Sequence, residues 1–202
     1  MQAKLSASNL ACRRGDRLLF RGLSFELNSG QALHVTGANG TGKTTLIRAL
    51  AGLTTPFAGE IVREGEVGLL DERPALDPDL TLGKALRFWE RVDECNDPSG
   101  ARLALGLDPL LDVPVRYLST GQRKRAALAA LLNRGVPIWL LDEPLSGLDK
   151  AAIEQVTALI QLHVDGGGLA LIASHQTLAL KDLTTLEIGN YAPTDHADEE
   201  LA

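Results

Sequence analysis

A run of nine residues in the first quarter of the chain has the composition of a phosphate-binding loop. The glycines of this run lack a Cβ atom, so the backbone can curl and direct successive N–H groups at phosphate oxygens. Lys43 would reach the β- and γ-phosphates of a nucleotide, and the Thr44 hydroxyl would hold Mg²⁺. The run fits the pattern G-x-x-x-x-G-K-[ST] and comprises Gly37, Ala38, Asn39, Gly40, Thr41, Gly42, Lys43, Thr44 and Thr45.

The segments on either side of this run favour a phosphate loop over an ordinary glycine-rich turn. Ala32–Val35 is apolar and predicts a strand, and Leu46–Leu50 continues as a helical pattern. The positive end of a helix that begins near Lys43 would add to the anion site. We therefore predict that the chain binds a nucleotide.

Two acidic residues follow an apolar segment in the second half of the chain. The apolar segment Ile138–Leu141 predicts a strand buried on both faces, and Asp142 and Glu143 come directly after it. Ligands bind at the carboxyl ends of parallel strands, where Asp142 would complete the magnesium shell and Glu143 would polarise the attacking water as a general base. The alternative is a strand that simply ends before the turn residue Pro144.

A cluster of small polar residues opens a predicted helix between these two motifs. It can act as an N-cap, or it can form a second anion site in which free N–H groups and a hydroxyl face a γ-phosphate. The basic run Arg123–Arg125 that follows is unfavourable at a helix N-terminus unless negative charge lies near it. The cluster comprises Ser119, Thr120, Gly121 and Gln122.

Two single residues stand at comparable positions further along the chain. Asp149 precedes a helical pattern and is by itself an adequate N-cap. His175 follows the apolar strand Leu169–Ala173, where its imidazole can reach a γ-phosphate. The remaining histidines (His34, His163 and His196) lack such a placement, and we assign them no role.

The order of predicted elements indicates an α/β fold with a mostly parallel sheet. Strands are expected at Leu5–Cys12, Leu18–Leu27, Pro137–Leu141, Leu169–Ala173 and 185–188, with a hairpin of 60–62 and 66–70 around Gly65. Helices are expected at Leu82–Val92, Ser99–Leu105, 120–133 and 150–163, and a short one near Thr177. Residues 81–134 read as a small inserted helical subdomain, and the acidic tail 192–202 as a frayed end.

The composition excludes several classes of protein. A net charge of −6 and the absence of a basic face argue against a nucleic-acid partner. Cys12 and Cys95 lack the spacing of metal ligands and suit a reducing compartment. No apolar run reaches the ~18 residues of a spanning helix, and we expect no signal peptide. Any role at a membrane would therefore depend on a partner.

Taken together, the motifs resemble the nucleotide-binding subunit of an ABC (ATP-binding cassette) transporter, over about Leu5 to Ile188. The resemblance implies one P-loop NTPase domain (1–202) with an antiparallel β-subdomain at its N-terminus, and ATP and Mg²⁺ as ligands. It also implies that residues 118–122 are the ABC signature, Ser146–Asp149 the D-loop and His175 the switch histidine. Such subunits form head-to-tail dimers in which ATP lies between the phosphate loop of one chain and the signature of the other, and they bind integral membrane permease subunits.

The chain departs from the family pattern at two places. Arg14 stands where an aromatic residue usually stacks on adenine, and a guanidinium can also stack on a base. The segment Asp71–Arg73 lacks the glutamine that usually contacts Mg²⁺, so Asp71 or Glu72 would have to replace it, or the contact is lost.

Short segments 12–20, 23–25 and 174–176 are similar to those of the haem-exporter ATPases of cytochrome c maturation. The resemblance implies a peripheral subunit on the cytoplasmic side of the inner membrane that energises haem handling, although no direct haem site is visible in the sequence. The ATPase of another small exporter, a soluble non-transport ABC ATPase, and a nucleotide-binding module without turnover remain as alternatives.

Overall fold

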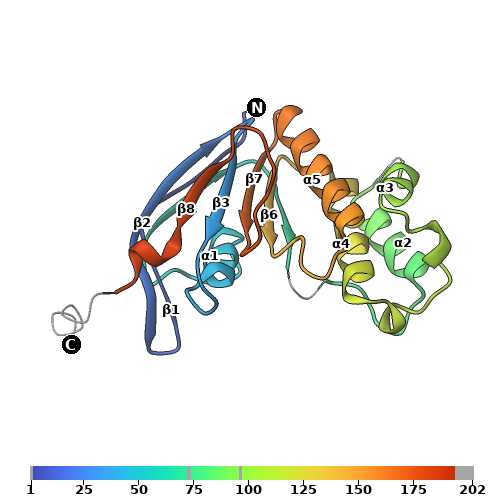
Figure 1. Ribbon diagram of the computed structural model, residues 1–202, viewed down its shortest axis with the longest axis horizontal. Coiled ribbons are helices and arrows are strands. Elements are labelled where there is room, and N and C mark those ends of the chain that lie inside the picture. Colours follow the sequence, from blue (N-terminus) through green and yellow to red (C-terminus); the bar gives the residue numbers. More distant parts are fainter. Residues whose placement is uncertain (1, 72–73, 96, 194–202) are drawn as a thin grey trace.

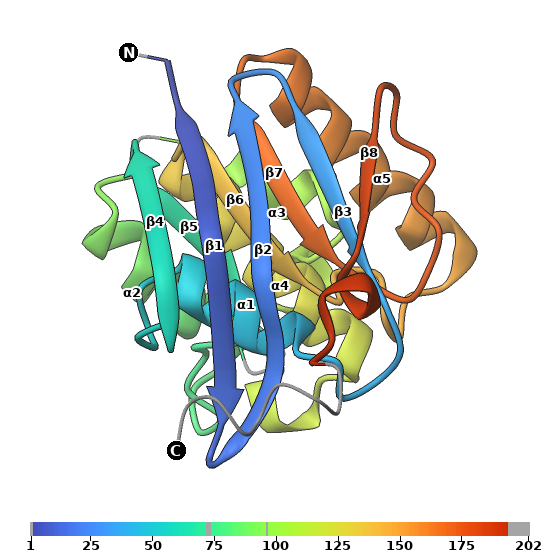
Figure 2. The ribbon, with the colours of Figure 1, turned by 90° about the vertical axis from the view of Figure 1, so that its left-hand side faces the viewer.

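A computed structural model describes residues 2–71, 74–95 and 97–193 of the chain. Three of its strands form an antiparallel sheet in the order β2-β1-β4 (Figure 2). They are β1 (Lys4–Arg14), β2 (Arg17–Asn28) and β4 (Ala58–Glu64). Alternate side chains of β1 and β2, among them Leu5, Leu10 and Leu23, are buried on one face of this sheet.

The other five strands form a parallel sheet in the order β5-β6-β7-β3-β8, and Figure 1 labels β6, β7, β3 and β8 among them. They are β3 (Ala32–Thr36), β5 (Val67–Leu70), β6 (Ile138–Asp142), β7 (Leu169–Ala173) and β8 (Thr184–Glu187). Every residue of the central strands β6 and β7 is buried, because both faces of the sheet are covered.

Helices cover the two faces of the parallel sheet differently. Helix α1 (Lys43–Leu50) lies between the two sheets (Figure 1). Its buried side chains pack in one hydrophobic core with Ile138 and Leu140 of β6. The neighbouring residues of β6, Trp139 and Leu141, face the opposite side. There they pack in one core with α2 (Leu82–Val92), α4 (Thr120–Arg134) and α5 (Lys150–Asp165); α3 (Ser99–Ala104) lies against α4.

The α/β class, the parallel core and the N-terminal antiparallel sheet are confirmed, but two predicted local structures are wrong. Residues 58–64 do not form a hairpin with 67–70: β4 pairs with β1, whereas β5 pairs with β6. Gly65, with φ of 121°, lets the chain pass from one sheet to the other. The predicted helix near Thr177 is an irregular segment, in which the Ser174 hydroxyl accepts the Gln176 amide and competes with a helical turn.

Two other expectations concern the tail and a membrane-spanning helix. Most of the tail predicted to fray, 194–202, lies outside the described residues. Within the described ranges, no helix is both long enough and apolar enough to span a bilayer.

Candidate nucleotide-binding and hydrolysis site

The predicted phosphate loop, acidic pair and histidine lie along one edge of the parallel sheet. Strand β7 is the neighbour of both β6 and β3, so Asp142 lies opposite Ala173, and Ala173 lies opposite Val35. All three strands run in the same direction, and each is followed by a segment that carries candidate residues. The start of the phosphate loop and the acidic pair are thus two strand spacings apart, about 10 Å.

Three glycines give the phosphate loop its shape. Gly37, Gly40 and Gly42 have φ angles of 148°, 81° and 108°, which side chains with a Cβ atom rarely adopt. A Cβ atom on Gly37 would also lie 2.7 Å from Ile188 Cγ2, and one on Gly42 would lie 3.0 Å from a ring carbon of Phe20. The loop is therefore held against its neighbours in a fixed curve that ends at the N-terminus of α1.

The lysine of the loop is folded over that curve. Lys43 is 7% exposed, and its Nζ donates to the carbonyl oxygens of Gly37 (2.6 Å) and Ala38 (3.2 Å). The Thr41 hydroxyl donates to the same Ala38 carbonyl at 2.8 Å. The ammonium group thus lies against the backbone of the loop, at the carbonyl oxygens of its first two residues.

The acidic pair consists of a buried carboxylate and a partly buried one. Asp142 ends β6 and is 2% exposed. Glu143 follows in a left-handed conformation (φ 47°), and its N–H donates to the Ala173 carbonyl oxygen at 2.8 Å. This conformation turns its carboxylate toward the segment after β7, where Oε2 lies 2.9 Å from His175 Nδ1 and accepts from the Ser174 hydroxyl at 3.3 Å. The structure therefore brings the predicted base and the predicted switch histidine into direct contact.

A histidine to which we assigned no role lies beneath this contact. The Nε2 atom of His34, in β3, is 3.1 Å from the Ser174 carbonyl oxygen, and its ring is 6% exposed. Burial lowers the pKa of His34, against the opposing effects of the Ser174 carbonyl and the Glu143 charge. Only strand pairing reveals this proximity, because 140 residues separate the two partners.

The N-cap interpretations of Ser119 and Asp149 are both correct. Ser119 Oγ accepts the Gln122 amide (3.2 Å), and the Gln122 side chain accepts the Ser119 amide (2.8 Å), which forms a capping box on α4. Asp149 Oδ1 accepts the Ala152 amide at 2.8 Å and caps α5. Helices α4 and α1 pack on opposite faces of the parallel sheet (Figure 1). The signature begins α4 and the phosphate loop leads into α1, so within one chain these two motifs lie on opposite faces of the sheet.

The structure separates Arg14 from the groove beside the phosphate loop. Arg14 ends β1 opposite Arg17, and it is Arg17, with its neighbours 16–19, that lines a groove with loop residues 39–41. Sequence reasoning missed Arg17 because the exact turn of the hairpin decides which arginine faces the loop. Asp71 is paired with Arg48 of α1 at 3.0 Å, and the alternatives Glu72 and Arg73 lie outside the described residues.

Sequence reasoning also missed a buried lysine in α4. Lys124 is 4% exposed and shares the buried stripe of this helix with Gly121, Leu128 and Leu131. Its Nζ donates to the carbonyl oxygen of Glu143 and to the Ser146 hydroxyl (3.0 Å). The sequence did contain a signal for this burial, because Lys124 lies three residues after Gly121 and four before Leu128, on the buried face of the helix. A buried ammonium group needs polar partners, so the spacing indicated a contact of this kind.

A glycine-shaped loop at the start of a helix, beside two carboxylates at the carboxyl ends of parallel strands, is the arrangement of a P-loop nucleotide triphosphatase. The comparisons with known proteins agree. The family model described as "ABC transporter" matches residues 20–146. The chain belongs to the ABC transporter ATP-binding family, in the group of the cytochrome c biogenesis ATP-binding export proteins, and it is an ATPase.

The relatives named "Cytochrome c biogenesis ATP-binding export protein CcmA" match the chain over nearly its full length. The protein of Novosphingobium aromaticivorans is 56% identical over 94% of this chain and 97% of its own length. That of Sphingopyxis alaskensis is 49% identical over 94% and 98%, respectively. Among solved structures, an ABC transporter ATP-binding protein from Pyrococcus furiosus has a TM-score of 0.81 at 22% identity and covers 94% of this chain and 100% of its own. This last likeness supports the fold alone, and the predicted family is confirmed by the sequence relatives.

Proposed function

We propose that this chain is the ATP-hydrolysing subunit of an exporter complex that energises haem handling for cytochrome c biogenesis. The observation that carries the hydrolytic part is the contact of Glu143 with His175 at the sheet edge beside the phosphate loop. The names and near-complete coverage of the CcmA relatives support the biological role.

The residues at the sheet edge fit a magnesium–ATP complex. The shaped loop 37–45 would hold the triphosphate with its amides, and Lys43 would exchange its contacts with loop carbonyls for the β- and γ-phosphates. Thr44 and the buried Asp142 supply the hydroxyl and carboxylate oxygens that Mg²⁺ prefers. When bound, the ion would neutralise charge on the phosphate oxygens.

Glu143 then acts as the general base for the attacking water. Its carboxylate accepts the water proton while the water oxygen attacks the γ-phosphorus and the bond to the bridging oxygen breaks. His175 contacts this carboxylate through Nδ1, which leaves Nε2 to contact the γ-phosphate. The histidine would thus orient the base and bind the group that is transferred.

A second copy of the chain would complete the site. Ser119–Gln122 and Asp149 sit at helix N-termini that lie on the other side of the sheet from the phosphate loop of the same chain. A head-to-tail dimer would place these residues of one copy against the ATP of the other. The capping box leaves the first amides of α4 oriented toward such a ligand.

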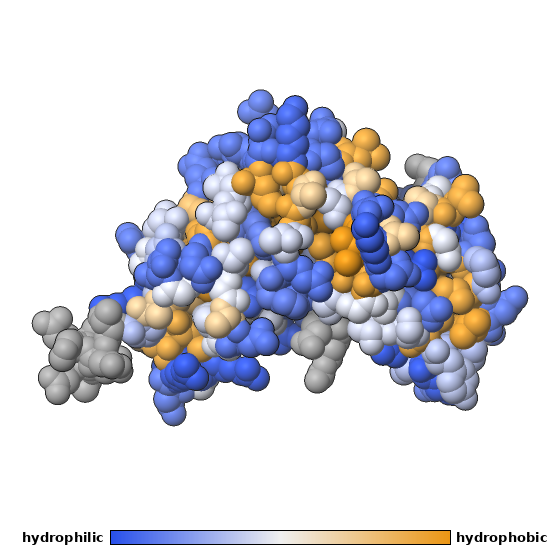
Figure 3. Space-filling view, viewed as in Figure 1, coloured by the Kyte–Doolittle hydropathy of each residue, from blue (hydrophilic) through white to orange (hydrophobic). Residues whose placement is uncertain are grey.

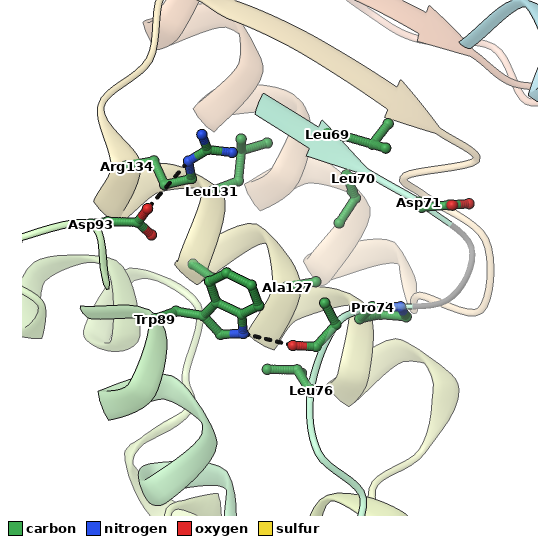
Figure 4. A pocket seen from close by; sticks show the side chains of 12 residues that line it. Leu69, Leu70, Asp71, Pro74, Leu76, Trp89, Asp93, Ala127, Leu131 and Arg134 are labelled. Atoms are coloured by element: carbon green, nitrogen blue, oxygen red, sulfur yellow. Dashed lines mark hydrogen bonds and ion pairs between the residues drawn. The ribbon is translucent and has the colours of Figure 1, made fainter. Parts of the chain in front are cut away.

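The membrane partner would contact the helical side of the molecule. A groove of about 250 Å³ runs between β5, α2 and α4, and Figure 4 shows the Trp89 ring in it, with its indole nitrogen donating to the Ala75 carbonyl at 2.6 Å. Asp93 and Arg134 pair at its far end at 3.4 Å. The groove adjoins Asp71, the first residue of the segment in which the family usually carries its Mg²⁺-contacting glutamine.

Exposed apolar side chains extend this surface beyond the groove. Phe88 and Val92 of α2 are each 57% exposed, and Leu103 of α3 is 73% exposed. Helices α2 and α3 lie at one end of the molecule (Figure 1), and Figure 3 shows apolar surface at that end. A permease bound here would hold the subunit peripherally at the inner face of the cytoplasmic membrane. Copurification of the detergent-solubilised complex would identify the membrane subunits. Trp89→Ala should weaken their recovery, whereas Leu162→Ala, on the exposed face of α5, should not.

A cellular assay tests the proposed function as a whole. In a bacterium that lacks its own copy, the wild-type gene should restore covalently attached haem in c-type cytochromes. Lys43→Ala should not restore it, and the exposed-lysine control Lys181→Ala should. Restoration by Lys43→Ala would reject an ATP-driven role, and failure of the wild type would reject the role in cytochrome c biogenesis.

A further inference from the structure

We infer that Lys124 is a positioning residue for the catalytic base Glu143, an inference that rests on the proposed function. The lysine does not face the phosphate loop; it projects from α4 into the turn that follows β6. Its ammonium group is bound to the Glu143 backbone carbonyl and to the Ser146 hydroxyl. Lys124 therefore acts on the backbone of the base and leaves the carboxylate free for its contacts with His175 and Ser174.

The backbone of Glu143 needs such support. A residue with a Cβ atom at φ 47° is in an uncommon, strained conformation that persists only where its surroundings fix it. The amide side of Glu143 is fixed by its hydrogen bond to Ala173. The carbonyl side is fixed by Lys124. The two bonds together set the direction in which the Glu143 side chain leaves the strand.

The same lysine connects the base to the signature helix. Lys124 lies one turn after the capping box of α4, and Gly121 of that helix packs directly on the turn after Ser146. A Cβ atom on Gly121 would lie 2.6 Å from the Gly147 carbonyl oxygen. The start of α4, the turn 143–147 and the base thus form one packed unit. In a dimer, binding of the partner's ATP at Ser119 would stabilise this unit through Lys124.

Burial strengthens the hydrogen bonds by which Lys124 holds the turn. The 4% exposure of Lys124 means that its ammonium group has lost most of its hydration, and hydrogen bonds from it are charge-assisted. A shift of about 1 Å in a reacting group can cost about 100-fold in rate. Within the described part of the chain, Lys124 does not contact the phosphate loop, so ATP binding should not depend on it. Loss of the ammonium should therefore reduce kcat and leave the KM for ATP nearly unchanged.

Steady-state ATP hydrolysis by the full-length chain tests this inference. Lys124→Met keeps the length of the stem and removes the donor; we expect kcat to fall about tenfold or more with KM within about twofold. Lys124→Gln retains an amide donor and should recover most of kcat. Lys84→Met, on the exposed face of α2, is the control and should behave as wild type. Lys124→Met combined with Glu143→Gln should be no slower than Glu143→Gln alone, because both changes act through one group.

The outcomes separate this inference from the proposed function. Three results would overturn the positioning role. They are a wild-type kcat in Lys124→Met, a loss of ATP binding in that variant as large as its loss of kcat, and a kcat in Lys124→Gln as low as in Lys124→Met. Undiminished turnover in Glu143→Gln would instead reject the base and with it the proposed mechanism. If Lys124→Met does not fold, the double variant Lys124→Met/Ser146→Ala removes the hydroxyl left unpaired and carries the same expectations.

Discussion

Gly37 offers a severe test of how the phosphate loop is built. Its φ of 148° favours glycine, and a Cβ atom there would lie 2.7 Å from Ile188 Cγ2, 3.0 Å from Glu187 Oε1 and 3.1 Å from Thr41 Oγ1. Ile188 is 1% exposed and has little room to move. The backbone strain of Gly37→Ala should cost about 1–3 kcal/mol. The overpacking should cost a further ~1–3 kcal/mol.

Thermal unfolding and ATP binding measure these costs. For a domain of this length each kcal/mol shifts Tm by about 2–4 °C, so Gly37→Ala should lower Tm by at least about 4 °C. It should also weaken ATP binding, because the first glycine of the cradle has moved. The control is Gly135→Ala at the end of α4, where φ is 61° and nothing lies within 4 Å of the added Cβ atom. It should cost only about 1–2 kcal/mol and leave ATP binding intact. Equal Tm values for the two variants, together with unaltered ATP affinity in Gly37→Ala, would refute the reasoning.

Three further predictions concern the groove beside the phosphate loop, the start of α4, and a partly buried histidine in the last turn of α5. Arg17, and not Arg14, lines the groove beside the phosphate loop, so in equilibrium titrations Arg17→Ala should weaken ATP binding and Arg14→Ala should not; the reverse result would contradict this placement. Gly121→Ala should suppress ATP hydrolysis by forcing α4 off Gly147, while ATP binding to the single chain persists; a fully active variant would contradict the packing seen there. Burial lowers the pKa of His163 below the ordinary imidazole value of 6.5, so its contribution to stability is complete above that pH and is lost as the pH falls below it. His163→Phe should therefore lose less stability than wild type from pH 7 to about pH 5 in urea titrations, and parallel losses would contradict this assignment.

Sequence reasoning succeeded where the signal is local. Ala32–Thr45 contains a complete strand, loop and helix start, and residues 138–143 contain a whole strand with the acids at its end. The predicted bounds of α2 and β7 agree with the structure, because a single period and clear flanking residues define each of them. The phosphate loop and the acidic pair could be placed for the same reason.

Apart from the predicted helix near Thr177, which a local hydrogen bond to Ser174 disfavours, the errors and omissions concern pairing between distant segments. The predicted hairpin at Gly65 failed because each of its two strands finds a partner far away in the sequence, in a different sheet. Lys124 and His34 reach the turn and the loop that carry Glu143 and His175 only through the assembled sheet and helices. A sequence pattern gives the face on which a residue lies, but it does not give the residue on the opposite side of the contact.

The most direct test of the account is the effect of Glu143→Gln on two quantities measured in one preparation, the affinity for magnesium–ATP and the rate of phosphate release. The amide keeps the shape of the carboxylate and cannot accept the water proton. We expect unchanged affinity and a rate at least ~100-fold lower. Phosphate release at the wild-type rate would contradict the central claim that ATP is hydrolysed at the edge of the sheet with Glu143 as the base.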